Sequence, residues 1–371
     1  MGFTFDSFNT TQRTCRVTGH SNPVPQNLVI PSTTMYGSLE YTVINISDQA
    51  FRNKGLISVT IPNTIEIIRR WAFRDNELES VIIPNSVTTI LLGAFSNNKL
   101  TSITLSSSLT GIDADVFRDN LLTSLVIPDS ITTILNNAFM NNKLTSVTFG
   151  SSLQYIYGYA FAYNELESVT IPNSVTYISS GVFAYNKLTS VIIPDSVTGI
   201  DGWAFAYNKL ESVIIPNSVT VLGDGAFRDN NLMSIKISTS LERIQPRAFM
   251  NNQLTEIEIP DSVNTISYMA FLGNQLTNVK IGERVDINPM FFGDFNDNGD
   301  FRGDYYSVSR LAGVYTWEGT RWLPEPTSKF YVSLDGISNK QVKKLIFNDN
   351  GTRKEVKKLF INIDGAKHQI M

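Results

Sequence analysis

A phenylalanine recurs every 22 residues along most of this chain, without one shift in spacing. Ala or Val precedes each copy. A fixed period of this length indicates a solenoid, in which each unit can bury its apolar residues only against its neighbours. The eleven copies are Phe51, Phe73, Phe95, Phe117, Phe139, Phe161, Phe183, Phe205, Phe227, Phe249 and Phe271.

Further apolar columns predict the secondary structure of each unit. Counting the repeated Phe as position 0, apolar residues recur at positions 5, 8, 10, 14, 17 and 21. Positions 8 and 10 alternate with outward residues among β-branched types, which predicts a strand. Proline at position 11 in seven units ends that strand, because it has no N–H to donate. We therefore predict a parallel sheet with one strand per unit, joined by short turns or 3-10 segments.

An asparagine column accompanies the phenylalanine column. Asn stands at position 3 in ten units, and only Lys54, in the first unit, breaks the column. The amide can donate to, and accept from, backbone groups that a turn leaves unpaired. A ligand-binding polar stripe is the alternative, but a binding face should vary along the array. We predict a structural hydrogen-bond ladder.

Taken together, these columns carry a resemblance. The pattern Ala-Phe-x-x-Asn-x-Leu-x-Ser-Val-x-Ile-Pro-x-Ser-Val-x-x-Ile resembles the BspA-like leucine-rich repeat family over about residues 28–292. The resemblance implies a leucine-rich-repeat solenoid that serves adhesion or recognition on bacterial surfaces, in protist surface proteins or in phage-encoded proteins. It offers no catalytic residues to transfer.

The chain divides into four predicted segments. Residues 1–50 form an N-terminal cap with a first incomplete repeat, 51–292 form the leucine-rich repeat array, and 293–327 form a capping segment and linker. Residues 328–371 form a C-terminal β-hairpin module, because Asp-Gly or Asn-Gly turns follow alternating apolar residues. This module resembles short tandem β-repeats of phage tail and bacterial surface proteins and is a candidate for pairing with another chain. Its turns are Asp335-Gly336, Asn350-Gly351 and Asp364-Gly365.

The composition mainly excludes classes of partner and of function. With a net charge of −4, the chain has no excess of basic residues to bind nucleic acid or an anionic membrane. No apolar stretch is long enough to span a membrane. The single cysteine, Cys15, excludes an intramolecular disulfide framework. The start lacks a basic segment followed by an apolar one, so a signal has been removed or the protein leaves its cell without one. No phosphate-binding loop, His/Glu metal cluster or acid/base carboxylate pair stands out. We expect no enzyme activity and no required cofactor.

One segment after the array has the composition of an ion site. Asp294, Asn296, Asn298 and Asp300 place oxygen donors at alternate positions around Gly299, as at the opening of a calcium loop. The closing glutamate is missing, because Tyr305 stands there. Calcium is therefore a candidate ligand, and an ordinary Asn/Asp/Gly turn is the alternative.

Two outward-facing sets of residues are candidate binding surfaces. Ile192 and Ile214 stand at position 9, beside serines at position 7, on a mildly apolar sheet face whose alternative explanation is β-propensity without a partner. Tyr163, Tyr185 and Tyr207 share position 2 in consecutive units, where flanking units carry Asp or Asn.

The tyrosines are the stronger candidate. Stacked phenols would present flat faces and hydroxyls that suit sugars or a protein partner. Trp203 and Tyr159 lie nearby in the sequence and are added to the predicted site. Recent duplication of one unit, or packing on the exterior of the coil, is the alternative.

These observations predict a non-enzymatic recognition or adhesion protein. We expect it outside the cell, binding a cell-surface glycan or protein, either on a bacterial surface or as a phage tail appendage. The missing signal and the β-repeat tail favour the virion. A structural scaffold that joins subunits, through residues 328–371 for example, is the second hypothesis, and a glycan-processing enzyme is the third.

Overall fold

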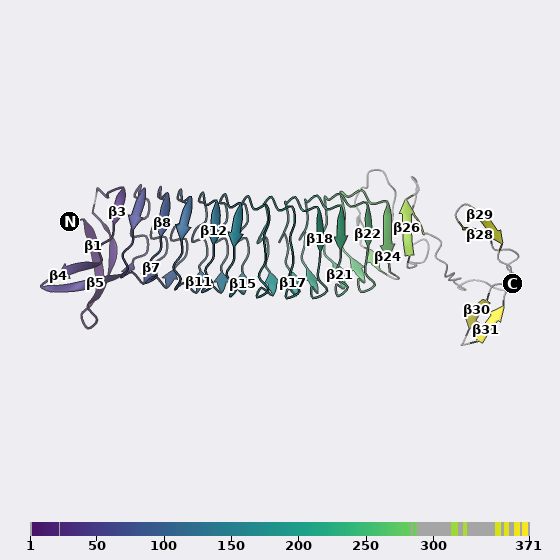
Figure 1. Cartoon of the computed structure of the whole chain (residues 1–371), viewed down its shortest axis with the longest axis horizontal. Coiled ribbons are helices and arrows are strands. Elements are labelled where there is room, and N and C mark those ends of the chain that lie inside the picture. Colours follow the sequence, from purple (N-terminus) through teal and green to yellow (C-terminus); the bar gives the residue numbers. More distant parts are fainter. Residues whose placement is uncertain are drawn as a thin grey trace. The chain divides into compact units, whose positions relative to one another are not determined.

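The computed structural model describes residues 2–21, 23–282 and 285–287, together with the backbone of six short strands farther along the chain. The chain separates into two compact units, Met1–Leu323 and Pro324–Met371. Within the part that the structure describes, no helix is long and apolar enough to cross a membrane. The array is built from β-strands and turns, as the repeat pattern predicts (Figure 1).

A column of three-residue strands lies along one side of the array, and neighbours pair in parallel register, as Ser80 with Ser102. Positions 168–170 and 190–192 form only one bridge, between Thr170 and Ile192. The column comprises β6 (Ser58–Thr60), β8 (Ser80–Ile82), β10 (Ser102–Thr104), β12 (Ser124–Val126), β14 (Ser146–Thr148), β18 (Ser212–Ile214), β20 (Ser234–Lys236) and β22 (Glu256–Glu258).

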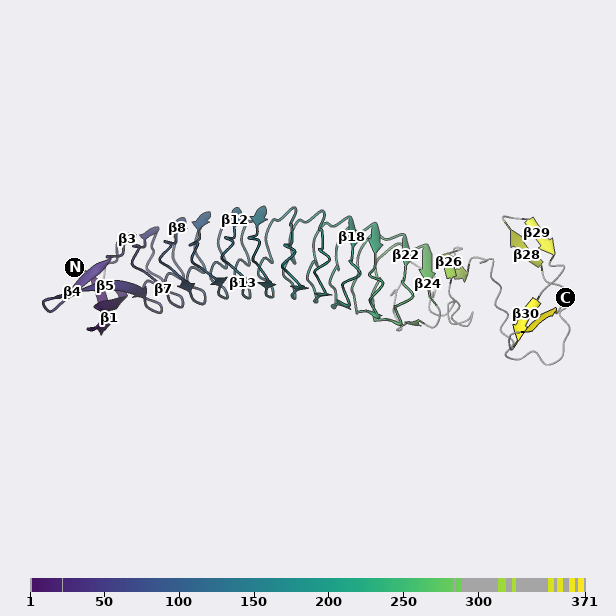
Figure 2. The ribbon, with the colours of Figure 1, turned by 60° about the horizontal axis from the view of Figure 1, so that its bottom comes forward.

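A second column of two-residue strands lies on the opposite side of each turn, at positions 16 and 17 (Figures 1 and 2). The repeat pattern does not predict these strands, because two residues are too few to show an alternation. Its members are β7 (Ile67–Ile68), β9 (Thr89–Ile90), β11 (Gly111–Ile112), β13 (Thr133–Ile134), β15 (Tyr155–Ile156), β16 (Tyr177–Ile178), β17 (Gly199–Ile200), β19 (Val221–Leu222), β21 (Arg243–Ile244), β23 (Thr265–Ile266) and β25 (Asp286–Ile287).

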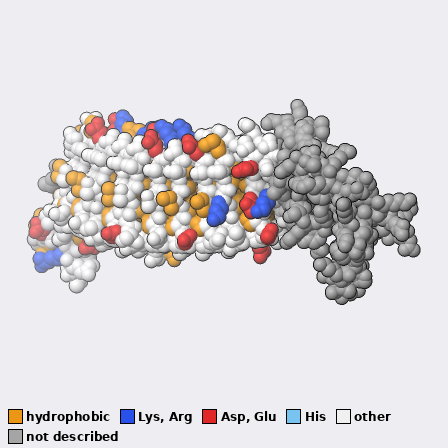
Figure 3. Space-filling model, turned by 45° about the vertical axis from the view of Figure 1, so that its right-hand side comes forward, with side chains coloured by type: hydrophobic (Ala, Val, Ile, Leu, Met, Phe, Trp, Pro, Cys, Tyr) orange, Lys and Arg blue, Asp and Glu red, His pale blue; other side chains and the backbone are white. Residues whose placement is uncertain are grey.

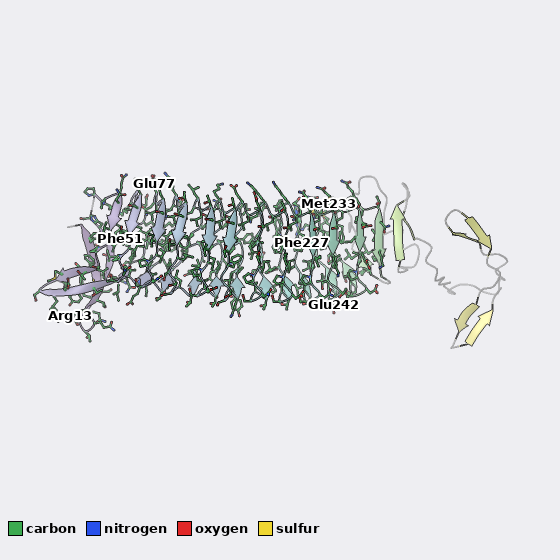
Figure 4. The ribbon with its side chains drawn as sticks, viewed as in Figure 1. Arg13, Phe51, Glu77, Phe227, Met233 and Glu242 are labelled. Atoms are coloured by element: carbon green, nitrogen blue, oxygen red, sulfur yellow. The ribbon has the colours of Figure 1, made fainter. Side chains whose placement is uncertain are left out.

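The eleven repeated phenylalanines form one continuous stack between the two strand columns. Centroids of consecutive rings lie 5.2 to 6.0 Å apart, with nearly parallel planes. All are buried, and Figure 4 shows Phe51 and Phe227 inside the coil, with Glu77, Met233 and Glu242 at its edges. The predicted internal stack is confirmed, and it is the central column of the hydrophobic core.

The predicted asparagine ladder is also confirmed. In the turn of Asn208, the side-chain amide donates to the carbonyl oxygens of Phe183, at 2.9 Å, and Phe205, at 3.1 Å. Its Oδ1 accepts from the N–H of Leu188 at 3.0 Å. Each Asn therefore satisfies three buried backbone groups, two of them in the preceding turn, which explains why Asn fills this position in every turn after the first.

A mixed sheet covers the N-terminal end of the array. β1 (Phe3–Asn9) pairs antiparallel with β2 (Thr14–His20), which pairs with β5 (Leu39–Ile46) and through it with β7. Phe3 contacts Phe51 edge to face at 6.3 Å and so closes that end of the stack. β3 (Asn27–Val29) pairs with β6, and β4 (Thr33–Tyr36) forms a hairpin with β5.

Farther along the chain the structure describes strand pairs. β24 (Asn278–Ile281) pairs antiparallel with β26 (Gly313–Trp317), which adjoins β27 (Trp322–Pro324). In the second unit two antiparallel pairs flank Asn350-Gly351 and Asp364-Gly365, as predicted, whereas Asp335-Gly336 lies outside the described residues. These pairs are β28 (Ile346–Asp349) with β29 (Thr352–Glu355) and β30 (Phe360–Ile363) with β31 (Ala366–Gln369).

Candidate functional site

Position 2 of every repeat has a left-handed backbone. The φ angle there lies between 53° and 76° in all eleven turns. Asn, Asp and Gly tolerate this conformation best, which explains their use in eight of the turns. Tyr163, Tyr185 and Tyr207 occupy the other three, so each carries a backbone cost of about 1–2 kcal/mol. Strain repeated in three consecutive turns favours a function that requires the tyrosines.

The three tyrosines form a stacked ladder on the exterior of the coil. Adjacent rings are 4.3 Å apart at their centroids and 8° from parallel at both steps. Tyr163 is 42% exposed, and Tyr185 and Tyr207 are half-buried. Burial, with the Tyr185 phenol as a second cause, raises the pKa of Tyr163, and burial also raises that of Tyr185. Both phenols therefore stay protonated near neutral pH and can donate hydrogen bonds.

The ladder presents fewer flat ring faces than the sequence predicts. Tyr185 is stacked on both sides, so neither of its faces is free. Tyr207 has one face on Tyr185, and the Arg228 guanidinium lies over the ring at 5.6 Å from its centroid. The surface instead offers a row of ring edges and hydroxyl groups, which suits hydrogen bonding to a ligand better than stacking on its faces.

Trp203 joins the C-terminal end of the ladder. Its ring lies 5.9 Å from that of Tyr207, and Arg228 is placed over it at 5.5 Å. Asp229 accepts a hydrogen bond from Arg228 Nε at 2.7 Å and so fixes the guanidinium. The structure therefore brings four side chains together: Trp203, Tyr207, Arg228 and Asp229.

The three tyrosine turns also share a small residue at position 1. Several flanking turns pair Arg at position 1 with Asp at position 2, as Arg228 with Asp229. The three tyrosine turns instead carry fully buried alanine at position 1. An Ala-Tyr pair replacing an Arg-Asp pair in consecutive units is therefore the sequence signal of this surface. The alanines are Ala162, Ala184 and Ala206.

Tyr159 belongs to a different column from the three stacked tyrosines, the column that also holds Trp203. It stands at position 20, where φ is also positive, and its ring lies over Gly181 in the next turn. A Cβ on that glycine would come within 2.4 Å of the ring. Trp71 lies over Gly93 in the same way. Packing on a glycine 22 residues later explains the position of this ring, and a ligand contact at Tyr159 stays a prediction.

The second predicted surface is exposed. Ile192 is 79% exposed and Ile214 is 64% exposed in the column of three-residue strands. Val126 and Ile82 are similarly exposed in the same column. Figure 3 shows hydrophobic side chains spread over one face of the array, with charged side chains gathered along its upper edge. These exposed side chains do not pack in the hydrophobic core. A ligand contact at Ile192 and Ile214 stays a prediction.

The predicted calcium ligands Asp294, Asn296, Asn298 and Asp300 lie outside the described residues. Among the described residues, no group of three or more His, Cys, Asp or Glu side chains is placed to hold a metal ion. The only cysteine, Cys15, is buried, and burial raises the pKa of its thiol to about 11.

A family comparison agrees with this architecture. The sequence profile described as "BspA type Leucine rich repeat region (6 copies)" matches residues 36–143, 110–233 and 221–297. These overlapping matches cover well over half of the chain, so the protein belongs to the BspA-type leucine-rich repeat family. No match is found among curated protein sequences.

Three solved structures of bacterial proteins have the same fold. A leucine rich cell surface protein from Faecalibacterium prausnitzii is 22% identical with a TM-score of 0.50, covering 84% of this chain and 97% of its own. A leucine-rich repeat protein from Bacteroides ovatus is 19% identical with a TM-score of 0.50, covering 79% and 97%. The pneumococcal vaccine antigen PcpA is 22% identical with a TM-score of 0.50, covering 77% and 82%. At these identities the likeness establishes the fold alone.

Proposed function

We propose that this protein is a non-enzymatic recognition protein that binds a ligand on a cell surface through the tyrosine ladder. The observation that carries the proposal is the placement of Tyr163, Tyr185 and Tyr207 in a strained backbone conformation that neighbouring turns fill with Asn or Asp. Neither the core nor the asparagine ladder needs these phenols. Aromatic residues are also enriched among those that dominate binding energy at interfaces.

The ligand class follows from the exposed groups. A row of phenol hydroxyls, spaced by about one turn and ending in Trp203 and Arg228, can hydrogen-bond repeatedly to an extended partner. Glycans and extended surface proteins both offer such repeats. Proteins with similar structures include a leucine rich cell surface protein and a vaccine antigen, which supports an extracellular role. A bacterial surface and a phage tail are the two locations we propose.

The test is a binding screen with the purified chain. Labelled protein is titrated onto a panel of bacterial cells and onto a glycan array, and each hit is then incubated with the protein and analysed for chemical change. We expect saturable binding with the ligand recovered intact. Turnover of a hit would assign an enzyme, and absence of saturable binding on every cell and glycan would favour the scaffold. Tail and baseplate genes next to the coding gene would place the protein in the virion.

A further inference from the structure

A polar hollow of about 570 Å³ lies where the N-terminal sheet meets the first turns of the array. One wall comes from β1 and β2, with Thr4 and Thr18. The other comes from the first turn, with Arg52 and Lys54, and from the Asp75 carboxylate of the second turn. The volume is that of a typical small-molecule site, about 300–1,000 Å³. Its lining is mostly polar, unlike the apolar lining typical of such sites, so it suits a strongly hydrated ligand.

Lys54 does not have to make the hydrogen bonds that the Asn residues make at the same position in later turns. In every later turn the position-3 Asn serves backbone groups of the preceding turn, but no regular turn precedes the first one. Asn76 of the next turn accepts from the N–H groups of Lys54 and Leu56 and donates to the carbonyl of Phe51. The Lys54 side chain is exposed on the hollow, and no partner for its ammonium group is found among the described residues.

Arg52 is held in place beside Lys54. Its Nε donates to Asp75 Oδ2 at 2.9 Å, and its Nη1 lies 3.5 Å from Gln49 Oε1. Burial raises the pKa of Asp75, but hydrogen bonds from Asn97 and Arg52 and the charge of Arg74 outweigh it, so the net pKa lies below its usual value. Asp75 is therefore ionised, and its charge is shared between Arg52 and Arg74. One carboxylate thus faces two arginines, so the group is already positive before the unpaired charge of Lys54 is added.

The other wall supplies hydroxyl groups. Thr18 Oγ1 donates to Thr4 Oγ1 at 2.9 Å, which leaves the proton of the Thr4 hydroxyl for another acceptor. Asn53, also on the hollow, adds an exposed amide. Paired hydroxyls and amides match the alternating donors and acceptors of a sugar ring, whereas a peptide would also require apolar contacts that this lining lacks.

We propose that this hollow binds an acidic sugar unit, with the carboxylate of the sugar at Lys54 and Arg52 and its ring hydroxyls at Thr4, Thr18 and Asn53. The site is separate from the tyrosine ladder and does not depend on the function proposed for it. A charge-assisted contact in an open hollow is also screened by salt, so affinity should fall as ionic strength rises.

The test uses glucuronic acid, glucose and a glutamate-containing tripeptide as probes, titrated into the full chain by calorimetry or followed by ligand-detected NMR. The variant is Lys54→Asn, which installs the residue that the other ten turns carry and should leave the melting temperature unchanged. The matched control is Lys209→Asn, an exposed lysine in another turn with the same change in charge.

We expect binding of glucuronic acid but not of glucose, an affinity at least about tenfold lower for Lys54→Asn, and parental affinity for Lys209→Asn. The proposal is overturned if glucuronic acid does not bind at millimolar concentration, or if Lys54→Asn binds it as well as the parent. Binding of the tripeptide with the same dependence on Lys54, and no binding of the sugar, would overturn the sugar assignment.

Discussion

Replacing Phe161 by alanine is expected to lower the free energy of unfolding by about 3–5 kcal/mol, as truncation of a buried Phe does in a rigid core. Phe161 is fully buried, stacks on Phe139 at 5.4 Å and on Phe183 at 6.0 Å, and meets Phe149 edge to face at 5.3 Å. The turns above and below are held by the same core, so they cannot close the cavity without breaking the register of their strands.

Damage from this substitution should spread along the array. Solenoid stability is a sum of unit and nearest-neighbour terms, so turns adjacent to residue 161 should lose protection before distant ones. Hydrogen exchange measured turn by turn, together with denaturant unfolding, checks both points. Tyr155→Ala, at a 50% exposed residue in a neighbouring segment, is the control and should change stability by less than about 1 kcal/mol. Uniform loss of protection along the array would contradict nearest-neighbour coupling.

Replacing Asn186 by alanine is expected to cost about 3 kcal/mol, although the side chain is small. Its Oδ1 accepts from the N–H of Leu166, and its Nδ2 donates to the carbonyls of Phe161 and Phe183. The substitution leaves these three buried backbone groups without their partner, and each unsatisfied buried group costs about 1–3 kcal/mol before relaxation.

The control for the asparagine ladder is Asn231→Ala. Asn231 is exposed at position 4 and contacts only the Gln253 amide through its side chain, at 3.3 Å. We expect its loss to change stability by less than about 0.5 kcal/mol. Denaturant unfolding of the two variants side by side measures the difference. Equal stability of Asn186→Ala and Asn231→Ala would show that water replaces the amide, and the ladder would not be a stabilising element.

The fold was largely predictable because one period dominates the chain. The phenylalanine and asparagine columns each repeat a single physical requirement in every turn, so sequence spacing places Phe205 and Asn208 correctly before any coordinates are known. The two-residue strands such as β17 could not be predicted, because Gly199 and Ile200 carry no alternation long enough to detect.

The site was predicted less well, for reasons of local geometry. Tyr163, Tyr185 and Tyr207 could be placed in one column, but whether their faces or edges meet solvent depends on ring orientation, which spacing does not set. The left-handed backbone at position 2 could in principle have been predicted, because Asn, Asp and Gly favour that conformation. Tyr159 is close to the ladder in sequence, but the spacing does not show that its ring packs over Gly181 in the next turn. The hollow beside Lys54 involves the N-terminal sheet, which has no repeat to extrapolate.

The central claim is that recognition runs through the tyrosine ladder, and equilibrium binding to target cells tests it most directly. The triple variant Tyr163→Asn, Tyr185→Asn and Tyr207→Asn is compared with the parent and with the control Ile192→Ser and Ile214→Ser. Asn suits the left-handed backbone at all three positions, so the melting temperature should stay the same or rise slightly. We predict that the triple variant loses at least about tenfold in affinity, or roughly 1.4 kcal/mol, while the control binds as the parent does. Parental affinity in the triple variant, with loss in the isoleucine control, would contradict the account and assign recognition to the exposed strand face.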